Sequence, residues 1–351
     1  MIQMFGVIRK YVVAVAFSTV CVSLFVSCGN PRRKCVKNKI KSGEFPYVEV
    51  PALIVGDSAR AAFAAENFWN NYMASDGAEK VSAGNLGAAY NEYLKTLVFL
   101  YSINAPYDSI YNSLYRLFSE FDAKCTGDST VKDRENWKKE FFAMIKFSEM
   151  WLYGANSAIR NDELYIPVLK AVINSGTLSH DEKLQYRYQL KIASLNRMGK
   201  KASDFDFEYV CEPSDMGSEK LVLKRGSLYS LRADYIMIYF NNPDCNACRE
   251  NLKILGGDDE IKKMVSSGNL KILSMYIDKD IDLWKKHYDE FPSGWIYAYD
   301  PKFVLRNNNI YGLKAIPSIY LLDGDMHVIV KDAEAAQCIY FLKNMESRAG
   351  R

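Results

Sequence analysis

The sequence predicts an α+β chain of two domains, an all-helical half followed by a half with an α/β pattern. Apolar residues recur at helical spacing from about residue 57 to residue 199, and short apolar runs separated by turns follow. The length of 351 residues exceeds that of one typical domain, which supports the same division. We therefore expect a helical domain at residues 45–200 and a second domain at residues 201–351.

The first 27 residues have the pattern of a secretory signal peptide. Arg9 and Lys10 precede an apolar run from Tyr11 to Val26, and the small residue Ser27 follows it. Cys28 comes directly after Ser27, which resembles the lipobox of bacterial lipoproteins and implies that Cys28 is acylated. The alternative is an uncleaved anchor, for which the run is short, because a membrane span needs about 20 apolar residues.

A basic tether is expected at residues 28–44, which hold six lysines and arginines. The signal peptide at residues 1–27 and the tether together predict a protein of the cell envelope. We expect it to be anchored to a lipid membrane, at the periplasmic face or in the outer membrane. The net charge of +3 and the lack of an arginine-rich motif give no reason to expect a nucleic-acid partner.

The helical half is predicted from three apolar faces and from residues that typically start or end helices. The faces are formed by Ala62, Phe63, Trp69, Tyr72 and Met73, by Ile110, Leu114, Leu117, Phe118 and Phe121, and by Trp137, Phe141, Ile145 and Trp151. Ser179 and Glu182 have the spacing of a capping box, and Gly199 is expected to end that last helix. Pro167 is expected to kink or start a helix near Glu163. Five or six helices result, and we assign no chemistry to them.

The second half is predicted to alternate strands with helices and to end in an antiparallel pair and a helix. The expected strands are 205–210, 221–223, 235–240, 270–277, 295–299, 318–322 and 327–330, and the expected helices start near 245 and cover 283–291, 303–311 and 333–345. The first two strands form a hairpin around a turn at 213–217, and the last two turn at 323–325.

Cys245 and Cys248 lie where the buried strand gives way to a helix. A cysteine at a helix start faces unpaired backbone N–H groups and the positive end of the helix dipole, which favour its thiolate. The thiolate is the form that attacks disulfides, so Cys245 is the predicted attacking sulfur. Cys248 follows one turn later and is the predicted resolving cysteine. Arg249 adds positive charge there, whereas Asp244 disfavours a nearby thiolate.

This order of elements resembles the thioredoxin fold. The residues that carry the resemblance are the strand at 235–240, Cys245 and Cys248 with their helix, and Ala315-Ile316-Pro317 ahead of the final hairpin. The stretches at 202–207 and 311–317 resemble membrane-tethered thiol–disulfide oxidoreductases of this fold. The resemblance implies an α/β/α sandwich with an N-terminal β-hairpin and a central insertion. The helical half resembles an uncharacterised domain that precedes such domains in some bacterial lipoproteins.

The resemblance also implies roles for Ile316 and Pro317. Pro317 is expected to be cis and to pack against the cysteine pair, and Ile316 is expected to bind an extended substrate chain through its backbone. The implied partners are protein disulfides and an unidentified electron donor or acceptor, with no cofactor. Two residues depart from thioredoxins proper, which have a buried carboxylate where this chain has Tyr239 and a tryptophan where it has Asp244.

Other interpretations of the cysteines stay open at this point. A zinc site needs four ligands, and the remaining candidates are scattered in the sequence, so no metal is expected; they are Cys211, His287, His327 and Cys338. Cys21 leaves with the signal peptide, and the four other cysteines outside the motif and the lipobox either pair or stay buried and free; they are Cys35, Cys125, Cys211 and Cys338. The alternative function is a non-catalytic envelope scaffold in which Cys245 and Cys248 form a structural disulfide.

Overall fold

A computed structural model describes residues 43–74, 81–211 and 222–349 of the chain. Its internal contacts divide the chain into two compact units, Met1–Leu190 and Lys191–Arg351. The predicted signal peptide, Cys28, Cys35 and the turn at 213–217 lie outside the described residues. Within the described ranges, no helix has both the length and the apolar character needed to cross a membrane.

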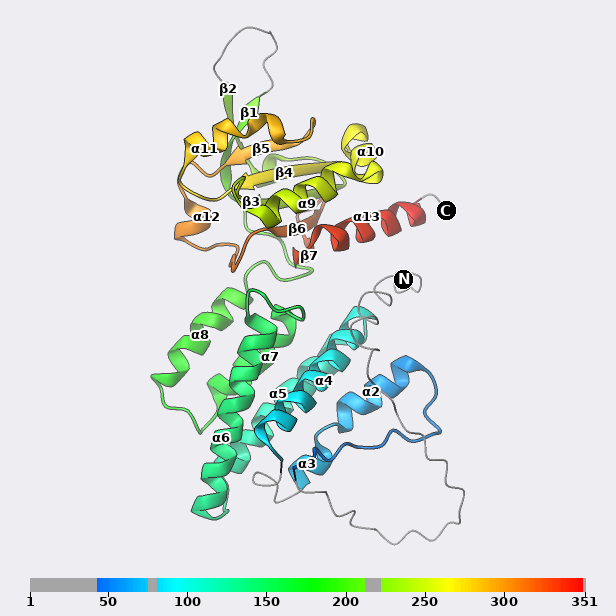
Figure 1. The fold of residues 1–351 in the computed structure, drawn as a ribbon, viewed down its shortest axis with the longest axis vertical. Coiled ribbons are helices and arrows are strands. Elements are labelled where there is room, and N and C mark those ends of the chain that lie inside the picture. Colours follow the sequence, from blue (N-terminus) through cyan, green and yellow to red (C-terminus); the bar gives the residue numbers. More distant parts are fainter. Residues whose placement is uncertain (1–42, 75–80, 212–221, 350–351) are drawn as a thin grey trace. The chain divides into compact units, whose positions relative to one another are not determined.

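The first unit is helical, as the sequence predicts, but has more helices than the five or six expected. The structure describes seven α-helices up to residue 193, and a single π-helical turn, η2 (Glu149–Tyr153), follows α6 directly. The α-helices are α2 (Asp57–Asn67), α3 (Asn70–Ala74), α4 (Ala83–Ser102), α5 (Tyr107–Thr126), α6 (Val131–Ser148), α7 (Asp162–Asn174) and α8 (Glu182–Ala193) (Figure 1).

Aromatic rings fill the core of this unit. Trp69, Tyr72, Phe121 and Trp137 are buried and lie against one another with ring centroids 5.8–6.3 Å apart. The predicted face of α5 is buried from Ile110 to Phe121, which confirms the helical period found in the sequence. Ala62 is exposed, so the first predicted face is narrower than expected.

Pro167 lies inside α7, four residues after Glu163. Proline has no N–H to donate to the carbonyl group one helical turn earlier. The hydroxyl group of Tyr107 donates to the Glu163 carbonyl oxygen instead, at 3.0 Å. A side chain from α5 thereby replaces a backbone hydrogen bond that α7 cannot make.

The capping box at the start of α8 is confirmed, because the Ser179 N–H donates to Glu182 and the Glu182 N–H donates to the Ser179 hydroxyl oxygen. The prediction that Gly199 ends this helix is wrong. The helix ends at Ala193, and Asn196 adopts a left-handed conformation with φ of 46° shortly after it. Gly199 instead donates its N–H to the Val328 carbonyl oxygen at 2.8 Å, beyond the helix end.

The second unit contains a seven-stranded mixed sheet in the order β2-β1-β5-β4-β3-β6-β7. Strands β3, β4 and β5 are parallel to one another, and the two hairpins at the sheet edges are antiparallel. The strands are β1 (Asp206–Cys211), β2 (Val222–Ser227), β3 (Tyr235–Asn241), β4 (Leu270–Tyr276), β5 (Ile296–Tyr299), β6 (Ser318–Asp323) and β7 (Val328–Ala333). The helices are α9 (Asn246–Gly257), α10 (Asp259–Ser267), α11 (Ile281–Lys286), α12 (Val304–Asn307) and α13 (Ala335–Ala349), with 3-10 turns η3 (Leu228–Ser230) and η4 (Tyr288–Glu290).

Alternate residues of the central strand β3 face two different cores. Met237 and Tyr239 pack with α9, α10 and α13, whereas Ile236, Ile238 and Phe240 pack against the opposite layer, which consists of α12 and irregular segments. Helices α9, α10 and α13 lie on one side of the sheet (Figure 1). Because β3 is buried on both faces, its apolar run is nearly continuous, as expected for a central parallel strand.

Several elements of the second unit differ from the prediction, among them α12, which ends at Asn307 rather than at residue 311. Helix α10 was not expected, and Asp258 caps it by accepting from the N–H groups of Glu260 and Ile261. Helix α11 ends at Lys286, so it is shorter than the predicted helix at 283–291. The insertion between β4 and β6 therefore consists of short helices around β5.

Candidate functional site

Cys245 is the N-cap residue of α9, at the carboxyl end of β3. Its backbone is extended, and its sulfur accepts a hydrogen bond from the Cys248 N–H at 3.4 Å. The Arg249 N–H donates to the Cys245 carbonyl oxygen at 3.0 Å and closes the first helical turn. The predicted placement of this sulfur at a helix start is therefore confirmed. Free N–H groups and the helix dipole at this position favour negative charge on it.

Cys248 has a different environment, because it is only 2% exposed, whereas Cys245 is partly exposed. Burial, together with its hydrogen bond to Cys245, raises the pKa of the Cys248 thiol to about 12. The Asn242 backbone N–H and the Arg249 charge oppose that rise. At neutral pH Cys248 is therefore a thiol and Cys245 is the accessible sulfur. Both cysteines are free in this structure.

The predicted proline loop lies beside Cys245. The Ile316–Pro317 peptide bond is cis, as expected from the resemblance. The Cys245 sulfur lies 3.9 Å from the Ile316 carbonyl oxygen, although the two residues are 71 positions apart. Residues 245–248 and 316–317 thus form one site.

Tyr239 stands where thioredoxins have a carboxylate, and its side chain contacts the backbone of Cys248. Its hydroxyl group donates to the Cys248 carbonyl oxygen at 2.5 Å. Burial keeps the pKa of Tyr239 far above its ordinary value, so the phenol is neutral. This residue supplies a hydrogen-bond donor at the first turn of α9 and no negative charge.

Arg249 ties together the loop in which Cys245 lies. Its guanidinium group donates to the Pro243 carbonyl oxygen at 2.7 Å and to the side chain of Asn246. Asp244 is exposed, and its N–H donates to the Asn242 side chain at 2.9 Å. The positive charge of Arg249 is therefore fixed next to the cysteine pair, while the Asp244 carboxylate faces solvent.

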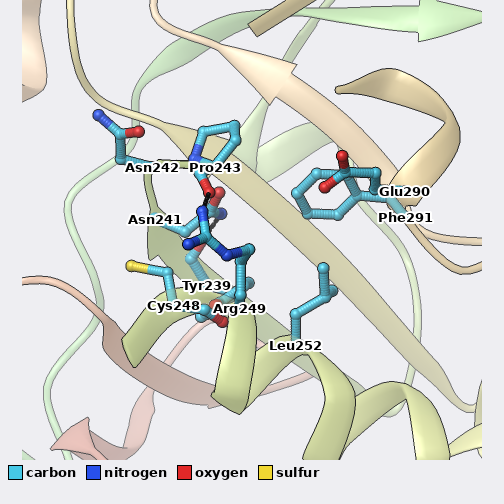
Figure 2. A pocket seen from close by; sticks show the side chains of 9 residues that line it. All are labelled: Tyr239, Asn241, Asn242, Pro243, Cys248, Arg249, Leu252, Glu290 and Phe291. Carbon is cyan, nitrogen blue, oxygen red and sulfur yellow. Dashed lines mark hydrogen bonds between the residues drawn. The ribbon is translucent and has the colours of Figure 1, made fainter. Parts of the chain in front are cut away.

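A small pocket lies beside Cys248, with a volume of about 220 Å³ that includes space open to solvent. Its lining residues are Tyr239, Asn241, Asn242, Pro243, Cys248, Arg249, Leu252, Glu290 and Phe291. Figure 2 shows Glu290 and Phe291 on the side of the pocket opposite Cys248. They come from the segment between α11 and β5, so the insertion contributes one wall.

The other candidate zinc ligands lie on separate elements of the second unit. Cys211 is on β1, Cys338 is buried within α13, and His287 and His327 pair with Glu290 and Asp323. Across residues 43–74, 81–211 and 222–349, no three histidine, cysteine or acidic side chains form a cluster that could hold a metal ion.

Sequence reasoning missed the residues that support the cysteines. Asn241 is buried and donates to the Ser274 hydroxyl oxygen on β4 at 2.9 Å. Asn242 donates to Asp278, just beyond the end of β4, at 2.6 Å. Two polar residues at the carboxyl end of a buried strand were the available signal, since sites of α/β sheets lie at that edge. Nothing in the sequence pairs Phe291 with this edge.

Comparisons with known proteins agree with this architecture. The chain is 30% identical to a thioredoxin-like protein from Bacteroides caccae of known crystal structure, covering 87% of this chain and 99% of that one with a TM-score of 0.72. A family model described as a domain of unknown function (DUF5106) matches residues 27–196. Human nucleoredoxin is 26% identical over 103 residues, which are 29% of this chain, and the match spans only 23% of nucleoredoxin.

Proposed function

Because this chain belongs to the thioredoxin-like family, we propose that it is a thiol–disulfide oxidoreductase in which Cys245 attacks and Cys248 resolves. One observation carries the proposal. A partly exposed sulfur lies at the start of α9, within 3.9 Å of the carbonyl group that precedes a cis-proline, and a second sulfur is buried one helical turn away.

The reaction that this arrangement supports has two steps. The Cys245 thiolate attacks one sulfur of a substrate disulfide, and the substrate's second sulfur leaves as a thiolate that takes a proton from water. The Cys248 thiol then gives its proton to solvent and attacks the Cys245 sulfur. The bond between Cys245 and the substrate breaks, and its electron pair leaves on the substrate sulfur. Two electrons have then passed from the dithiol to the substrate; oxidation of a substrate is the reverse.

Ile316 and Pro317 are the proposed substrate-binding residues. The Ile316 carbonyl group lies beside Cys245, where an extended segment of a substrate would pass on its way to the sulfur. Backbone contacts of this kind select extended chains without selecting their sequence. Protein disulfides are therefore the proposed substrates, together with a separate electron donor or acceptor that resets the pair.

The proposal places the enzyme in the cell envelope, with Cys28 as its lipid anchor. The support comes from the sequence, in which Cys28 follows an apolar run and Ser27. Cys28 lies outside the described residues. Mass spectrometry of the membrane fraction tests this part, because an acylated N-terminal Cys28 is expected and an intact residue 1–27 segment would contradict it.

Two cysteine variants test the enzymatic proposal. Cys248→Ser is expected to accumulate mixed disulfides through Cys245, because the resolving sulfur is gone. Cys245→Ser is expected to lose exchange with a model disulfide by at least a hundredfold, since the accessible thiolate is removed. Cys211→Ser, on β1 and away from the site, is the matched control. If both active-site variants exchange disulfides at the parent rate, the protein is not an oxidoreductase, and the result favours the alternative of a non-catalytic envelope scaffold.

A further inference from the structure

Ser318 directly follows Pro317 and is the first residue of β6. It is fully buried and pairs with Phe240 near the carboxyl end of β3. Its hydroxyl group donates to a carboxylate oxygen of Asp332 on β7 at 2.9 Å. Because proline has no N–H group, Ser318 is also the first residue after Ile316 whose backbone can donate a hydrogen bond. The end of the proline loop is therefore fixed to two strands, to β3 by pairing and to β7 by this side chain.

Asp332 reaches Ser318 from a bulge in β7. This strand has one extra residue relative to β6 between two of their pairs, which are Ile319 with Ala333 and Leu321 with Val330. Within this stretch Asp332 adopts a left-handed conformation with φ of 56°. That conformation is unfavourable for a residue with a Cβ atom, although aspartate tolerates it better than most. Bulges re-aim side chains, and the side chain of this bulge is the acceptor for the Ser318 hydroxyl group.

The other end of the proline loop is also tied to β6. The hydroxyl group of Tyr320 donates to the Tyr311 carbonyl oxygen at 2.9 Å, and both residues are buried. Between these two ties, the Ile316 side chain packs against the cores on both sides of the sheet. The Ile316 carbonyl oxygen lies 3.9 Å from the Cys245 sulfur. The place of this carbonyl group therefore depends on how the two ends of the loop are held.

We propose that Ser318 and Asp332 are a positioning pair, whose hydrogen bond holds the Ile316 backbone where it binds the extended chain of a substrate. The proposal rests on the proposed function, because it assigns the pair to the substrate-binding residues Ile316 and Pro317. Backbone hydrogen bonds weaken steeply when donor and acceptor are poorly aligned, so a shifted loop binds a chain less tightly. Because the pair acts on the loop and not on the cysteines, it affects peptide binding and leaves the reaction of the sulfurs unchanged.

Two disulfides with a shared leaving group separate chain binding from chemistry. One is an unstructured peptide whose single, central cysteine is bonded to 2-mercaptoethanol, and the other is bis(2-hydroxyethyl) disulfide, which has no peptide backbone. In each reaction the protein dithiol gives two electrons to the probe. The probe's disulfide bond breaks, its two sulfurs leave as thiols, and Cys245 and Cys248 become bonded. Single-turnover reactions, quenched with acid and measured by mass spectrometry, give the half-saturating peptide concentration and the limiting rate.

Asp332→Gly removes the carboxylate, and glycine accepts the left-handed backbone of the bulge without strain. The half-saturating peptide concentration is expected to rise about tenfold with the limiting rate within about twofold, which is the signature of lost binding alone. The rate with bis(2-hydroxyethyl) disulfide is expected to stay within about twofold, since this probe has no chain for the loop to bind. Asp332→Asn keeps an acceptor oxygen and tolerates the same backbone, so its half-saturating concentration should stay within about threefold of the parent value.

Ser318→Ala removes the donor of the same bond and is expected to weaken peptide binding about as much as Asp332→Gly. The double variant should be no weaker than either single variant, because both changes remove one interaction. Asp325→Gly is the matched control, since it makes the same change at an exposed residue in the turn at the opposite end of β6.

Three results would overturn the proposal. The first is a parent-like half-saturating concentration in both Asp332→Gly and Ser318→Ala. The second is an equal loss of rate with bis(2-hydroxyethyl) disulfide, which would mean that the pair supports the whole site and not the binding of the chain. The third is an Asp332→Asn variant that binds the peptide as poorly as Asp332→Gly.

A binding measurement without exchange keeps this inference distinct from the proposed function. In a background with Cys245→Ser and Cys248→Ser, the same peptide with serine at its centre is titrated by NMR, and the Ile316 and Ser318 amide signals are followed. Adding Asp332→Gly is expected to weaken binding about tenfold. No binding, or an unchanged affinity, refutes the positioning pair even where the parent exchanges disulfides. Weakened binding in a protein that does not exchange disulfides supports the pair and refutes the enzyme.

Discussion

Cys248 is 2% exposed, and Cys245, three residues earlier, is partly exposed. The same kind of side chain therefore meets two environments within one helical turn. Burial raises the pKa of Cys248 to about 12, so this thiol is protonated at neutral pH. Cys245, with its sulfur at a helix start, is the more accessible of the two.

Burial acts on a carboxyl group in the helical unit in a similar way. It raises the pKa of Glu140 to about 7, while the hydrogen bond from the Tyr72 hydroxyl partly offsets the effect. Because the folded-state pKa lies above the ordinary value of 4.5, folding favours the protonated acid. This contribution to stability is complete below about pH 4.5 and is lost as the pH rises through about 7.

Glu140→Gln is expected to remove that pH dependence. The free energy of unfolding of the parent should fall by about 1–2 kcal/mol relative to the variant between pH 4.5 and pH 8, after discounting for the partial exposure of Glu140. Urea titrations at both pH values measure the difference. Glu135→Gln, an exposed residue on the same helix, is the control. If the free energies of unfolding of the parent and of Glu140→Gln differ by the same amount at both pH values, the raised pKa of Glu140 is contradicted.

At the scale of elements, α7 and β3 both depend on side chains from neighbouring elements. Helix α7 contains Pro167 and receives a hydrogen bond from Tyr107 on α5 at the carbonyl group that Pro167 cannot serve. Strand β3 ends at Asn241, whose side chain donates to Ser274 on β4, and the next residue, Asn242, donates to Asp278 just after β4. At α7 a side chain supplies the donor that the backbone lacks, and at the end of β3 side chains join this strand to the segment at the end of β4.

Tyr107→Phe is expected to cost about 1 kcal/mol of unfolding free energy, because the Glu163 carbonyl loses this donor. In a Pro167→Ala background, residue 167 regains an N–H that can bond the same carbonyl, so the cost of Tyr107→Phe should shrink. A double-mutant cycle in urea measures this coupling. Equal costs in the two backgrounds would mean that Tyr107 does not substitute for the missing N–H.

Local patterns were sufficient to predict much of the fold and the two cysteines. The capping box at Ser179 and the helix start at Cys245 depend on residues within one turn, so the sequence displays them. Helix α10 is short, with only Ile261 and Met264 buried, and its period was too brief to detect. The predicted end of α8 was too late in the sequence. Gly199 was expected to adopt the left-handed conformation that ends the helix, but Asn196 already adopts it three residues earlier.

Contacts between residues that are far apart in the sequence and that the sheet brings together could not be predicted from the sequence. The contact of Asn242 with Asp278 depends on the parallel register of β3 and β4, which pairs Asn241 with Tyr276. Arg306 joins them from α12, 64 positions further along the chain than Asn242. The resemblance supplied the position of Pro317, and the departures at Tyr239 and Asp244 marked where this site would differ.

For the whole molecule, the proposed redox site and the residues that support it lie within one unit. The cysteine pair, the proline loop and the residues from Asn242 to Arg306 all belong to residues 191–351. The helical unit has its own aromatic core and a match to a domain of unknown function. We expect the second unit to carry out thiol–disulfide exchange. The redox behaviour of the full chain therefore tests the proposed function.

The most direct measurement is a redox titration of the purified protein in glutathione buffers, with the Cys245–Cys248 peptide quantified by mass spectrometry. A single reversible two-electron transition between dithiol and disulfide is expected, with a slope of about 30 mV per tenfold change in the equilibrium ratio. The transition should vanish in Cys245→Ser. A pair that stays fully bonded, or fully reduced, across every buffer from strongly reducing to strongly oxidising would contradict the central claim.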